Sequence, residues 1–220
     1  MKKVAISQLR YLPNMNYIQR VYLSDVFVLM DKTKLHRRDF EHRNKILTEN
    51  GTEKMLTLQI ASTKDTPAKD CVFRDGFSPN EHKEIIRRSY RKSKFYSDEI
   101  LDKIYPVKFD GFFDFSKKML MNITDMLEIH SQINTDDAED DLRGVARLER
   151  ICEQNDADAY ISGSFGRNYI DEFRYDIFYH HSYGEDYKGK MSKLSIVDNI
   201  FRYGIKDVEN SIKTEIDLRR

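Results

Sequence analysis

The chain has 220 residues, of which 40% are hydrophobic, and its 37 basic residues balance 37 acidic ones. This composition allows one domain over residues 1–220, and the zero net charge excludes a global positive field that would draw the chain onto nucleic acid or anionic lipid. The apolar run near the N-terminus is too short for a signal peptide, and no stretch approaches the ~20 apolar residues of a membrane span. The two cysteines, Cys71 and Cys152, have no CxxC or paired histidine spacing. We therefore expect a cytoplasmic protein without a disulfide or metal site.

The first predicted elements form a strand–helix–strand unit. Residues 2–7 are a short β-prone run, residues 14–25 carry apolar side chains at helical spacing, and residues 26–30 are a continuous apolar run typical of a strand buried on both faces. Such a unit joins parallel strands by a right-handed crossover. The sequence therefore predicts an α/β fold with a mostly parallel sheet.

A hairpin is predicted next. The dipeptide Asn50-Gly51 separates two further β-prone runs, and Asn-Gly is the pair most favoured in tight hairpin turns. We expect the two runs to pair as antiparallel strands.

The middle third of the chain has a helical rhythm. Residues 78–105 begin with a Ser-Pro helix-entry signal, residues 112–133 continue the pattern, and a further helix runs through 142–155. The acidic run at 135–141 favours an exposed loop and helix N-terminus over a metal site, since it lacks the alternation and central glycine of a calcium loop. We expect a helical insertion, or subdomain, over roughly residues 78–155.

The stretch after this insertion returns the chain to the sheet and then turns. If residues 160–162 form a strand and residues 167–173 begin a helix, Gly163 and Gly166 lie at a strand-to-helix turn, where backbone amides and the helix dipole attract anions. Arg167 would add a charged donor. The sequence of this turn matches neither the P-loop motif GxxxxGK[ST] nor the dinucleotide-binding motif GxGxxG, so no cofactor is predicted. A ligand-binding turn and a turn required only by packing both stay open.

Asp31 follows the predicted strand at 26–30, and ligands of open α/β sheets bind beyond the carboxyl ends of such strands. Its carboxylate is either a site group or a structural partner of the basic segment that follows. Asp25 precedes the strand and is read as a turn residue that bonds to backbone. Arg43 and Asn44, in the basic segment, could present donors to an anionic substrate at the rim of the sheet.

Histidines and serines give no diagnostic pattern. The candidate general bases among the histidines are His36, His42, His180 and His181. Their spacing is more typical of surface or structural histidines. No GxSxG elbow occurs, so a Ser-His-Asp triad cannot be assigned, and the serines of "YISGS" and "KLSIVD" are equally plausible as helix caps.

Several stretches in the same order resemble the landmarks of the WbqC-like family. They are a strand ending in Gln8, then "YLP", a helix with Tyr17, "SDVFVLMD", "FEHRNKI", "YISGSFGRNYID" and "LSIVDNIFRYG". The matching positions are Gln8, Tyr11, Pro13, Tyr17, Asp25, Asp31, Phe40, Arg43, Asn44, Ser162, Gly163, Tyr169, Ser195, Asp198 and Gly204. The chain departs from the family at Gln8-Leu9-Arg10, where relatives read Gln-Pro, and at Lys32 and Lys34, where relatives carry an acid and a glutamine. The stretch 177–193 also looks shorter and more polar than usual.

The resemblance implies a role in building bacterial surface polysaccharide such as O-antigen, with transfer of an amino acid such as glycine onto a sugar as one suggestion. The partners are then a sugar or sugar nucleotide and an activated amino-acid or acyl donor. We expect the site where the loop after the 26–30 strand meets the 162–168 turn. The expected catalytic residues are Asp31, as base or amine anchor, and Arg43 and Asn44, as donors. The expected substrate-binding residues are Gln8, Tyr11, Ser162, Gly163, Gly166, Arg167, Tyr169, Ser195 and Asp198.

Two alternatives stay beside the transferase hypothesis. The first is a non-catalytic module that binds a sugar nucleotide or glycan, for which 13 tyrosines and 13 phenylalanines offer stacking platforms. The second is a transferase acting on nucleic acid, raised by the basic, aromatic-rich runs "HRRDFEHRNK" and "RRSYRKSKF". The balanced net charge and the family landmarks argue against a nucleic-acid partner.

Overall fold

The computed structural model describes residues 1–35, 39–63, 65–136, 141–168, 170–180, 186–187, 190–191, 193–214 and 218–219. Its strands are β1 (Lys3–Gln8), β2 (Val26–Met30), β3 (Arg43–Leu47), β4 (Glu53–Thr57), β5 (Ile60–Ala61), β6 (Val72–Phe73), β7 (Gln132–Thr135), β8 (Ala159–Gly163), β9 (Asp176–His180), β10 (Asp186–Tyr187), β11 (Lys190–Met191) and β12 (Leu218–Arg219). Its α-helices are α1 (Met15–Leu23), α2 (Asn80–Tyr90), α3 (Asp98–Ile104), α4 (Gly111–Met126), α5 (Gly144–Gln154), α6 (Ile196–Tyr203) and α7 (Ile205–Thr214), and two 3₁₀ helices are η1 (Ala68–Asp70) and η2 (Ser164–Asn168). In this described part of the chain, the helices are too short or too polar to cross a bilayer.

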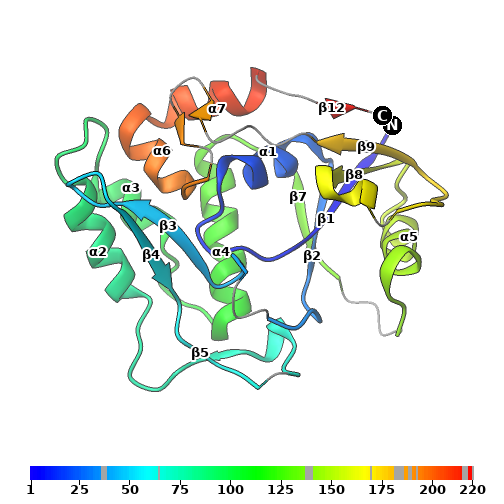
Figure 1. Ribbon diagram of the computed structural model, residues 1–220, viewed down its shortest axis with the longest axis horizontal. Coiled ribbons are helices and arrows are strands. Elements are labelled where there is room, and N and C mark those ends of the chain that lie inside the picture. Colours follow the sequence, from blue (N-terminus) through cyan, green and yellow to red (C-terminus); the bar gives the residue numbers. More distant parts are fainter. Residues whose placement is uncertain are drawn as a thin grey trace.

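The main sheet has the strand order β12-β9-β8-β1-β2-β7 (Figure 1). The strands from β9 to β7 are parallel, while β12 runs antiparallel to β9. Strand β1 lies at the centre, where Val4 pairs with both Val26 and Tyr160. The predicted unit β1–α1–β2 and the mostly parallel α/β sheet are confirmed.

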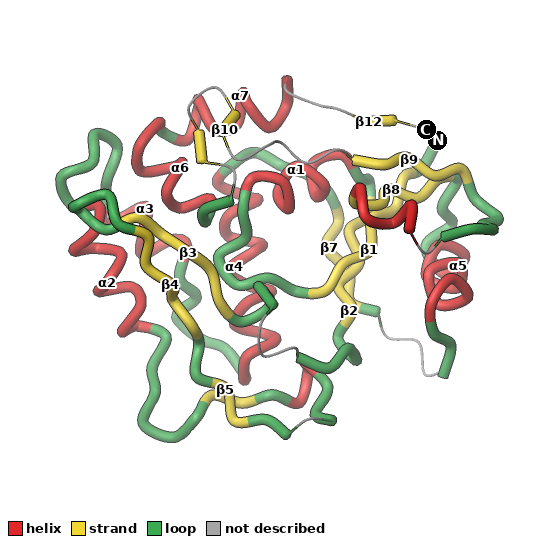
Figure 2. Tube along the Cα trace, viewed as in Figure 1, coloured by secondary structure: helices red, strands yellow, loops and turns green. Residues whose placement is uncertain are grey.

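Helices cover both faces of this sheet (Figure 2). Side chains alternate along β1. Val4 and Ile6 pack with Leu148 and Ile151 of α5, whereas Ala5 belongs to the larger core on the other face. That larger core also contains side chains from α1, α4, α6 and α7. Because both faces are buried, the carboxyl edge of the sheet is the place where the strands can present residues to a ligand.

The predicted hairpin is also confirmed. Strands β3 and β4 pair antiparallel, and the Thr48 amide donates to the Thr52 carbonyl over 2.8 Å. Gly51 has a φ of 75°, a left-handed conformation that glycine adopts without a steric penalty. The Asn50-Gly51 pair thus supplies the backbone geometry that the turn needs.

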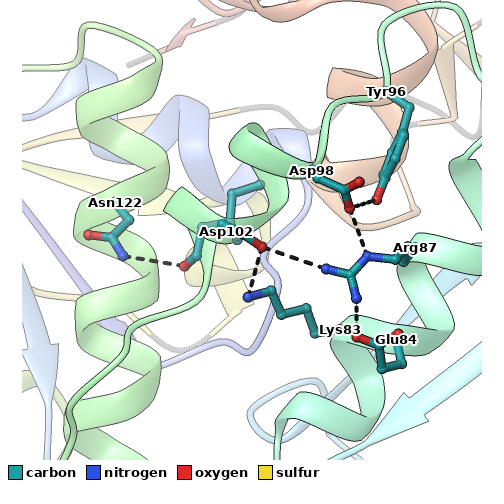
Figure 3. Close-up of polar contacts among 8 residues, drawn as sticks. Lys83, Glu84, Arg87, Tyr96, Asp98, Asp102 and Asn122 are labelled. Atoms are coloured by element: carbon teal, nitrogen blue, oxygen red, sulfur yellow. Dashed lines mark hydrogen bonds and ion pairs between the residues drawn. The ribbon is translucent and has the colours of Figure 1, made fainter.

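Helices α2 and α3 are joined by a polar cluster on the surface (Figure 3). Arg87 donates to Asp98 over 2.7 Å and also pairs with Glu84, while Lys83 lies 2.9 Å from Asp102. Tyr96 adds a hydrogen bond of 2.6 Å to Asp98. Surface pairs of this kind each contribute little, but a network can fix one helix against the other.

The helical insertion contains one strand that the sequence did not predict. A single helix was expected to continue through residues 112–133, but α4 ends at Met126 and Glu128 takes a left-handed φ of 51°. Residues 132–135 then form β7, which pairs with β2 at the edge of the sheet. The expectation of helix beyond Met126 is therefore wrong. The helix expected through 142–155 is confirmed as α5. Residues 137–140 of the acidic run lie outside the described residues.

Candidate functional site

A cavity of about 480 Å³ opens at the carboxyl edge of the sheet. Its lining contains Ile6, Ser7, Gln8, Arg10, Asn14, Asn16, Tyr17, Arg20, Met30, Thr33, Leu148, Tyr160, Gly163, Phe165, Gly166 and His180. We call this space the edge cavity. Its size lies within the range of small-molecule sites.

Three strand ends form the floor of the edge cavity. Gln8 ends β1, Gly163 ends β8 and His180 ends β9, and Gly163 is paired directly with His180. Neighbouring parallel strands finish at the same edge, so residues far apart in sequence meet there. The predicted residues Gln8 and Gly163 are thus brought together.

One face of α1 forms a wall of the edge cavity. Asn14 caps the helix by accepting from the Tyr17 amide over 3.0 Å, and Asn16 and Arg20 lie one helical turn apart. The Tyr17 hydroxyl donates to the Gln8 carbonyl over 2.9 Å and so ties the helix to the end of β1. Burial raises the pKa of Tyr17 to about 12, against the opposing effect of Arg20 and Arg10. Tyr17 is therefore a neutral hydrogen-bond donor.

The charged side chains in the described lining of the edge cavity are basic. Arg10 and Arg20 are half-buried in its lining, and its described lining residues include neither aspartate nor glutamate. The Arg20 guanidinium lies 5.5 Å from the Tyr17 ring centre, and that of Arg10 lies 5.9 Å from the Phe40 ring centre. Arg10 stands at one of the departures from the family pattern. Two guanidinium groups in one partly enclosed space favour an anionic ligand.

Gly163 makes room for one of these arginines. A Cβ atom at this position would lie 3.2 Å from Nη1 of Arg20. The φ angle of Gly163 is not in the left-handed region, so conformational strain is not the reason for glycine here. The close approach of the Arg20 side chain to the backbone is the reason that the structure shows.

The element after β8 differs from the expected one. The described residues of the stretch 167–173 do not form an α-helix; the five-residue 3₁₀ helix η2 follows the strand directly. A helix dipole at Gly163 is therefore absent, because η2 is too short to sum the peptide dipoles. Gly166 is required by packing, since a Cβ atom there would collide with Oγ of Ser162.

Helix η2 also places an aromatic ring at the cavity. Phe165 lines the edge cavity although 79% of its surface is exposed. An exposed aromatic ring beside a polar cavity offers a flat face on which a sugar ring or a base can stack. Arg167, two residues further on, is exposed and stacks on the Tyr179 ring at 4.6 Å. Arg167 is not among the residues that line the cavity.

The loop after β2 reaches the edge cavity through Met30 and Thr33. Asp31 lies between them but does not line it. Its side chain is 8% exposed, its Oδ1 has no hydrogen-bond partner, and burial raises the pKa of its carboxyl group while Lys69 opposes that shift. The Asp31 carbonyl accepts from the Lys69 amide over 3.0 Å. The backbone of Asp31 thus anchors the segment around η1.

A second cavity of about 490 Å³ adjoins the edge cavity and shares Met30, Thr33 and Leu148 with it. Lys32 and Lys34, two further departures from the family pattern, line this second space. Lys34 is paired with Asp65 over 2.6 Å.

Two predicted site residues lie in the core. The Tyr11 hydroxyl is buried between Nδ1 of His82 and the hydroxyl of Tyr105, at 3.0 and 2.9 Å. Asn44 is buried, donates to the Leu12 carbonyl, and accepts from the Lys45 amide over 2.8 Å. Leu12 has a left-handed φ of 43°, an unfavourable conformation for a leucine, and the bond from Asn44 helps to hold it.

Two others hold α6 in place. Ser195 caps α6 by accepting from the Val197 amide over 3.2 Å. Asp198 is 1% exposed and accepts from the Tyr90 hydroxyl over 2.7 Å and from Nε of Arg202 over 3.0 Å. The Tyr90 hydroxyl in turn accepts from the Leu47 amide over 3.0 Å. We call this set the Tyr90–Asp198 network.

The remaining candidates are placed as follows. Arg43 is half-buried in β3 and donates to the Asp39 carbonyl over 3.3 Å, outside the edge cavity. Ser162 is buried, and its Oγ contacts the Gly163 carbonyl over 3.1 Å. Asp25 bonds to the Lys3 amide over 2.7 Å, which confirms its structural reading.

Among the candidate bases, His42 lines a separate cavity. Its Nδ1 is buried without a hydrogen-bond partner, and burial lowers the pKa of its imidazole. His180 lines the edge cavity. His36, His181 and the site candidate Tyr169 lie outside the described residues.

The fold and this edge define a class of protein: an open α/β sheet, covered on both faces, with a cationic cavity at its carboxyl edge. A family model described as the WbqC-like protein family matches residues 8–210, so the chain belongs to this family. The chain is also 26% identical over 220 residues to a Mycobacterium tuberculosis protein named "Uncharacterized protein Rv1507c", covering 93% of this chain and 95% of that one. No solved structure matches the chain.

Sequence reasoning did not find Asn16, Arg20 or Phe165. Asn16 and Arg20 lie on the helix of the strand–helix–strand unit, and their i, i+4 spacing is a signal that would have placed them on one face. Phe165 lies within the quoted landmark stretch but was not singled out, because its exposure depends on η2.

Proposed function

We propose that the edge cavity binds an anionic sugar derivative, a sugar phosphate or sugar nucleotide, and that the protein is a group transferase of bacterial surface-polysaccharide assembly. The observation that carries the proposal is the pair Arg10 and Arg20 in a cavity whose described lining has no acidic residue. Guanidinium groups bind phosphate through paired hydrogen bonds. Phe165 supplies a face for the sugar ring or base.

The transferred group in this proposal is an acyl or aminoacyl group such as glycine, and the acceptor is a hydroxyl or amine of the bound sugar. Membership of the WbqC-like family supports a role of this kind. The adjoining cavity lined by Lys32 and Lys34 offers room for a second substrate beside the first, as a two-substrate transfer requires. The catalytic roles expected for Asp31, Arg43 and Asn44 remain predictions. None of these three residues is in the lining of the edge cavity.

The test combines binding with chemistry. Purified protein is screened by thermal shift against a panel of sugar nucleotides, then incubated with each binder and with activated amino acids, and the sugar is followed by mass spectrometry. A ligand at a hundred times its dissociation constant should stabilise the fold by about 2.7 kcal/mol. A mass gain on the sugar supports transfer.

The second candidate function is non-catalytic binding of a sugar nucleotide, and the composition of the cavity lining favours it. The edge cavity has no carboxylate among its described lining residues, and carboxylates are frequent general bases. A stabilising shift with a sugar nucleotide but no mass gain across the donor panel would favour a non-catalytic binding partner of another enzyme. No shift with any phosphorylated sugar would contradict both functions.

A further inference from the structure

A polar cavity of about 370 Å³ lies where the chain leaves the β3–β4 hairpin and enters β5 (Figure 1). Its lining contains Leu35, His42, Thr57, Leu58, Gln59, Ile60, Ser62 and Arg74. We call this space the hairpin cavity. The described linings of the hairpin cavity and the edge cavity have no residue in common, and the size of the hairpin cavity also lies within the range of small-molecule sites. The hairpin cavity is therefore a separate candidate site.

Backbone hydrogen bonds join three segments of the hairpin cavity. The Leu58 amide donates to the His42 carbonyl over 2.8 Å, and the Arg74 amide donates to the Gln59 carbonyl over 2.9 Å. The segment 58–59 thus bonds to His42 with one residue and to Arg74 with the next. Segments paired in this way lie about 4.8 Å apart, so the backbones of His42 and Arg74 are separated by roughly 10 Å. The fold therefore brings an arginine and a histidine that are far apart in sequence to the same small space.

Arg74 brings a positive charge to the hairpin cavity. It is exposed, and its guanidinium makes no ion pair or hydrogen bond with the described residues. Lys34, which precedes Leu35 in the chain, is in contrast paired with Asp65 over 2.6 Å. The described lining contains no aspartate or glutamate, and Asp75, the residue after Arg74, is not part of it. A guanidinium in this position can bind a carboxylate or phosphate through paired hydrogen bonds.

His42 adds a polar group to the same lining. Its Nδ1 is buried and has no hydrogen-bond partner, which is rare because buried polar atoms are almost always hydrogen-bonded. Burial and the neighbouring Arg43 lower the pKa of His42, while Asp39 opposes them. The imidazole is therefore neutral near neutral pH and has one N–H donor and one lone pair for a ligand.

The other polar residues of the lining suit a ligand that carries hydroxyl groups. Thr57, Gln59 and Ser62 are exposed, and their side chains make no hydrogen bonds with the described residues. Hydroxyl and carboxamide groups can both donate and accept, as the hydroxyls of a sugar do. The hairpin cavity thus combines one charged donor with several groups that can pair with hydroxyls.

We propose that the hairpin cavity binds a small hydroxylated anion, a uronic acid or sugar phosphate unit, with Arg74 as the anion-binding group and His42 beside it. The shared chemistry of these ligands is a carboxylate or phosphate on a ring that carries hydroxyls. The inference does not rest on the proposed function, because the arginines of the edge cavity belong to other parts of the chain. It gives the protein a second site for an acidic sugar unit.

Histidine ring signals in NMR spectra report binding at this cavity. The signals of His42 are assigned with His42→Gln, and the protein is titrated at constant pH with glucuronate, with glucose 6-phosphate and with glucose as the uncharged control. We expect the His42 signals to move with at least one anion and to stay in place with glucose. A stronger response to glucuronate assigns a carboxylate ligand, and a stronger response to glucose 6-phosphate assigns a phosphate ligand. The signals of His82, which is buried beside Tyr11, should not move.

Variants of Arg74 test the anion-binding group. Arg74→Gln should weaken binding of the responding anion by about ten- to a hundredfold, the effect of losing a hydrogen bond to a charged group. Arg74→Lys keeps the charge without the planar fork, so its affinity should lie between the two. The matched control is Arg88→Gln, since Arg88 is exposed on α2 outside the cavity lining, and its affinity should equal that of the wild type. Urea unfolding should change little in all three variants, because both arginines are exposed.

The two anion sites fail separately. Inorganic pyrophosphate probes the edge cavity, and Arg20→Gln should weaken its binding without changing the response of His42 to the sugar anions. Absence of pyrophosphate and sugar-nucleotide binding contradicts the proposed function while the hairpin cavity stands. Unmoved His42 signals with both anions, an equal response to glucose, or equal affinity in the wild type and Arg74→Gln contradicts anion binding at the hairpin cavity.

Discussion

The edge cavity and the Tyr90–Asp198 network both contain family landmarks, yet their polar groups are used in different ways. In the network, the buried Asp198, Tyr90 and the Leu47 amide bond to one another and fix α6 against β3. In the edge cavity, Arg10 and Arg20 border about 480 Å³ of open space. The comparison teaches that a family landmark can be buried in a contact of the fold, as Asp198 is, or can line an open cavity, as Gly163 does, and that burial and partners distinguish the two.

The largest effect should come from breaking the network. Asp198→Ala removes the acceptor of the Tyr90 hydroxyl and of Arg202, and we expect a loss of about 3 kcal/mol in the free energy of unfolding. Urea unfolding measures it, with Glu99→Ala, an exposed partner of Lys103, as the near-neutral control. Pyrophosphate affinity of the folded variant should be unchanged, and a tenfold loss would place Asp198 in the site.

A pH effect should come from the other buried cluster, around Tyr11. Burial lowers the pKa of His82 from 6.5 to about 4, so between these values the unfolded chain binds a proton that the folded protein does not. Stability is therefore lost as pH falls through this window. At pH 5, 1.5 units below 6.5, the loss is about 2 kcal/mol at 1.4 kcal/mol per unit.

The check is unfolding of the wild type and His82→Gln at pH 8 and pH 5. The variant should lose about 2 kcal/mol less between the two pH values, because glutamine does not titrate. An equal loss in both proteins would contradict burial of a neutral His82.

Gly166 has both a packing role and a place in the edge cavity. It packs on Ser162, and it lies in η2, the helix that places Phe165 at the cavity. Gly166→Ala should destabilise the fold by about 1–2 kcal/mol, because the new Cβ collides with Ser162 Oγ. The double variant with Ser162→Gly removes the colliding side chain and should recover part of that loss. Strict additivity in urea unfolding would argue against the contact.

The smallest effect is expected at Arg167, although its residue type favours anion binding. Its guanidinium stacks on Tyr179 and lies outside the cavity lining, so Arg167→Ala should change pyrophosphate affinity by less than about threefold and stability by about 0.5–1 kcal/mol. Calorimetric titration and urea unfolding check the two values. A thirtyfold loss of affinity would move the anion site toward the end of η2.

Periodicity predicted the parts of the fold that local sequence controls. The β1–α1–β2 unit and the hairpin at Asn50-Gly51 have strong patterns and are confirmed. β7 has a short sequence, "QINT", directly after a helical rhythm, and it becomes a strand only because β2 offers a partner. The helix expected at Arg167 is replaced by the five-residue 3₁₀ helix η2, in which Gly166 packs on Ser162.

The candidate site was predictable only where a strand ends. Gln8 was a candidate through the family resemblance and Gly163 through the glycine turn after a predicted strand, and both lie at the carboxyl edge where parallel strands gather ligands. Arg20 and Phe165 depend on the orientation of α1 and η2, which no local pattern specifies. Tyr11, Asn44 and Asp198 resembled site residues by type, but their partners lie far along the chain and their burial is a property of the tertiary fold.

Calorimetric titration of inorganic pyrophosphate into the wild type, Arg10→Gln and Arg20→Gln tests the central claim most directly. Each variant should bind about ten- to a hundredfold more weakly, since a hydrogen bond to a charged group is worth about 1.5–3 kcal/mol, while urea unfolding changes little. Binding to the wild type should also weaken with added salt. Unchanged affinity in both variants, or no binding to the wild type, would contradict an anion site at the carboxyl edge of this sheet.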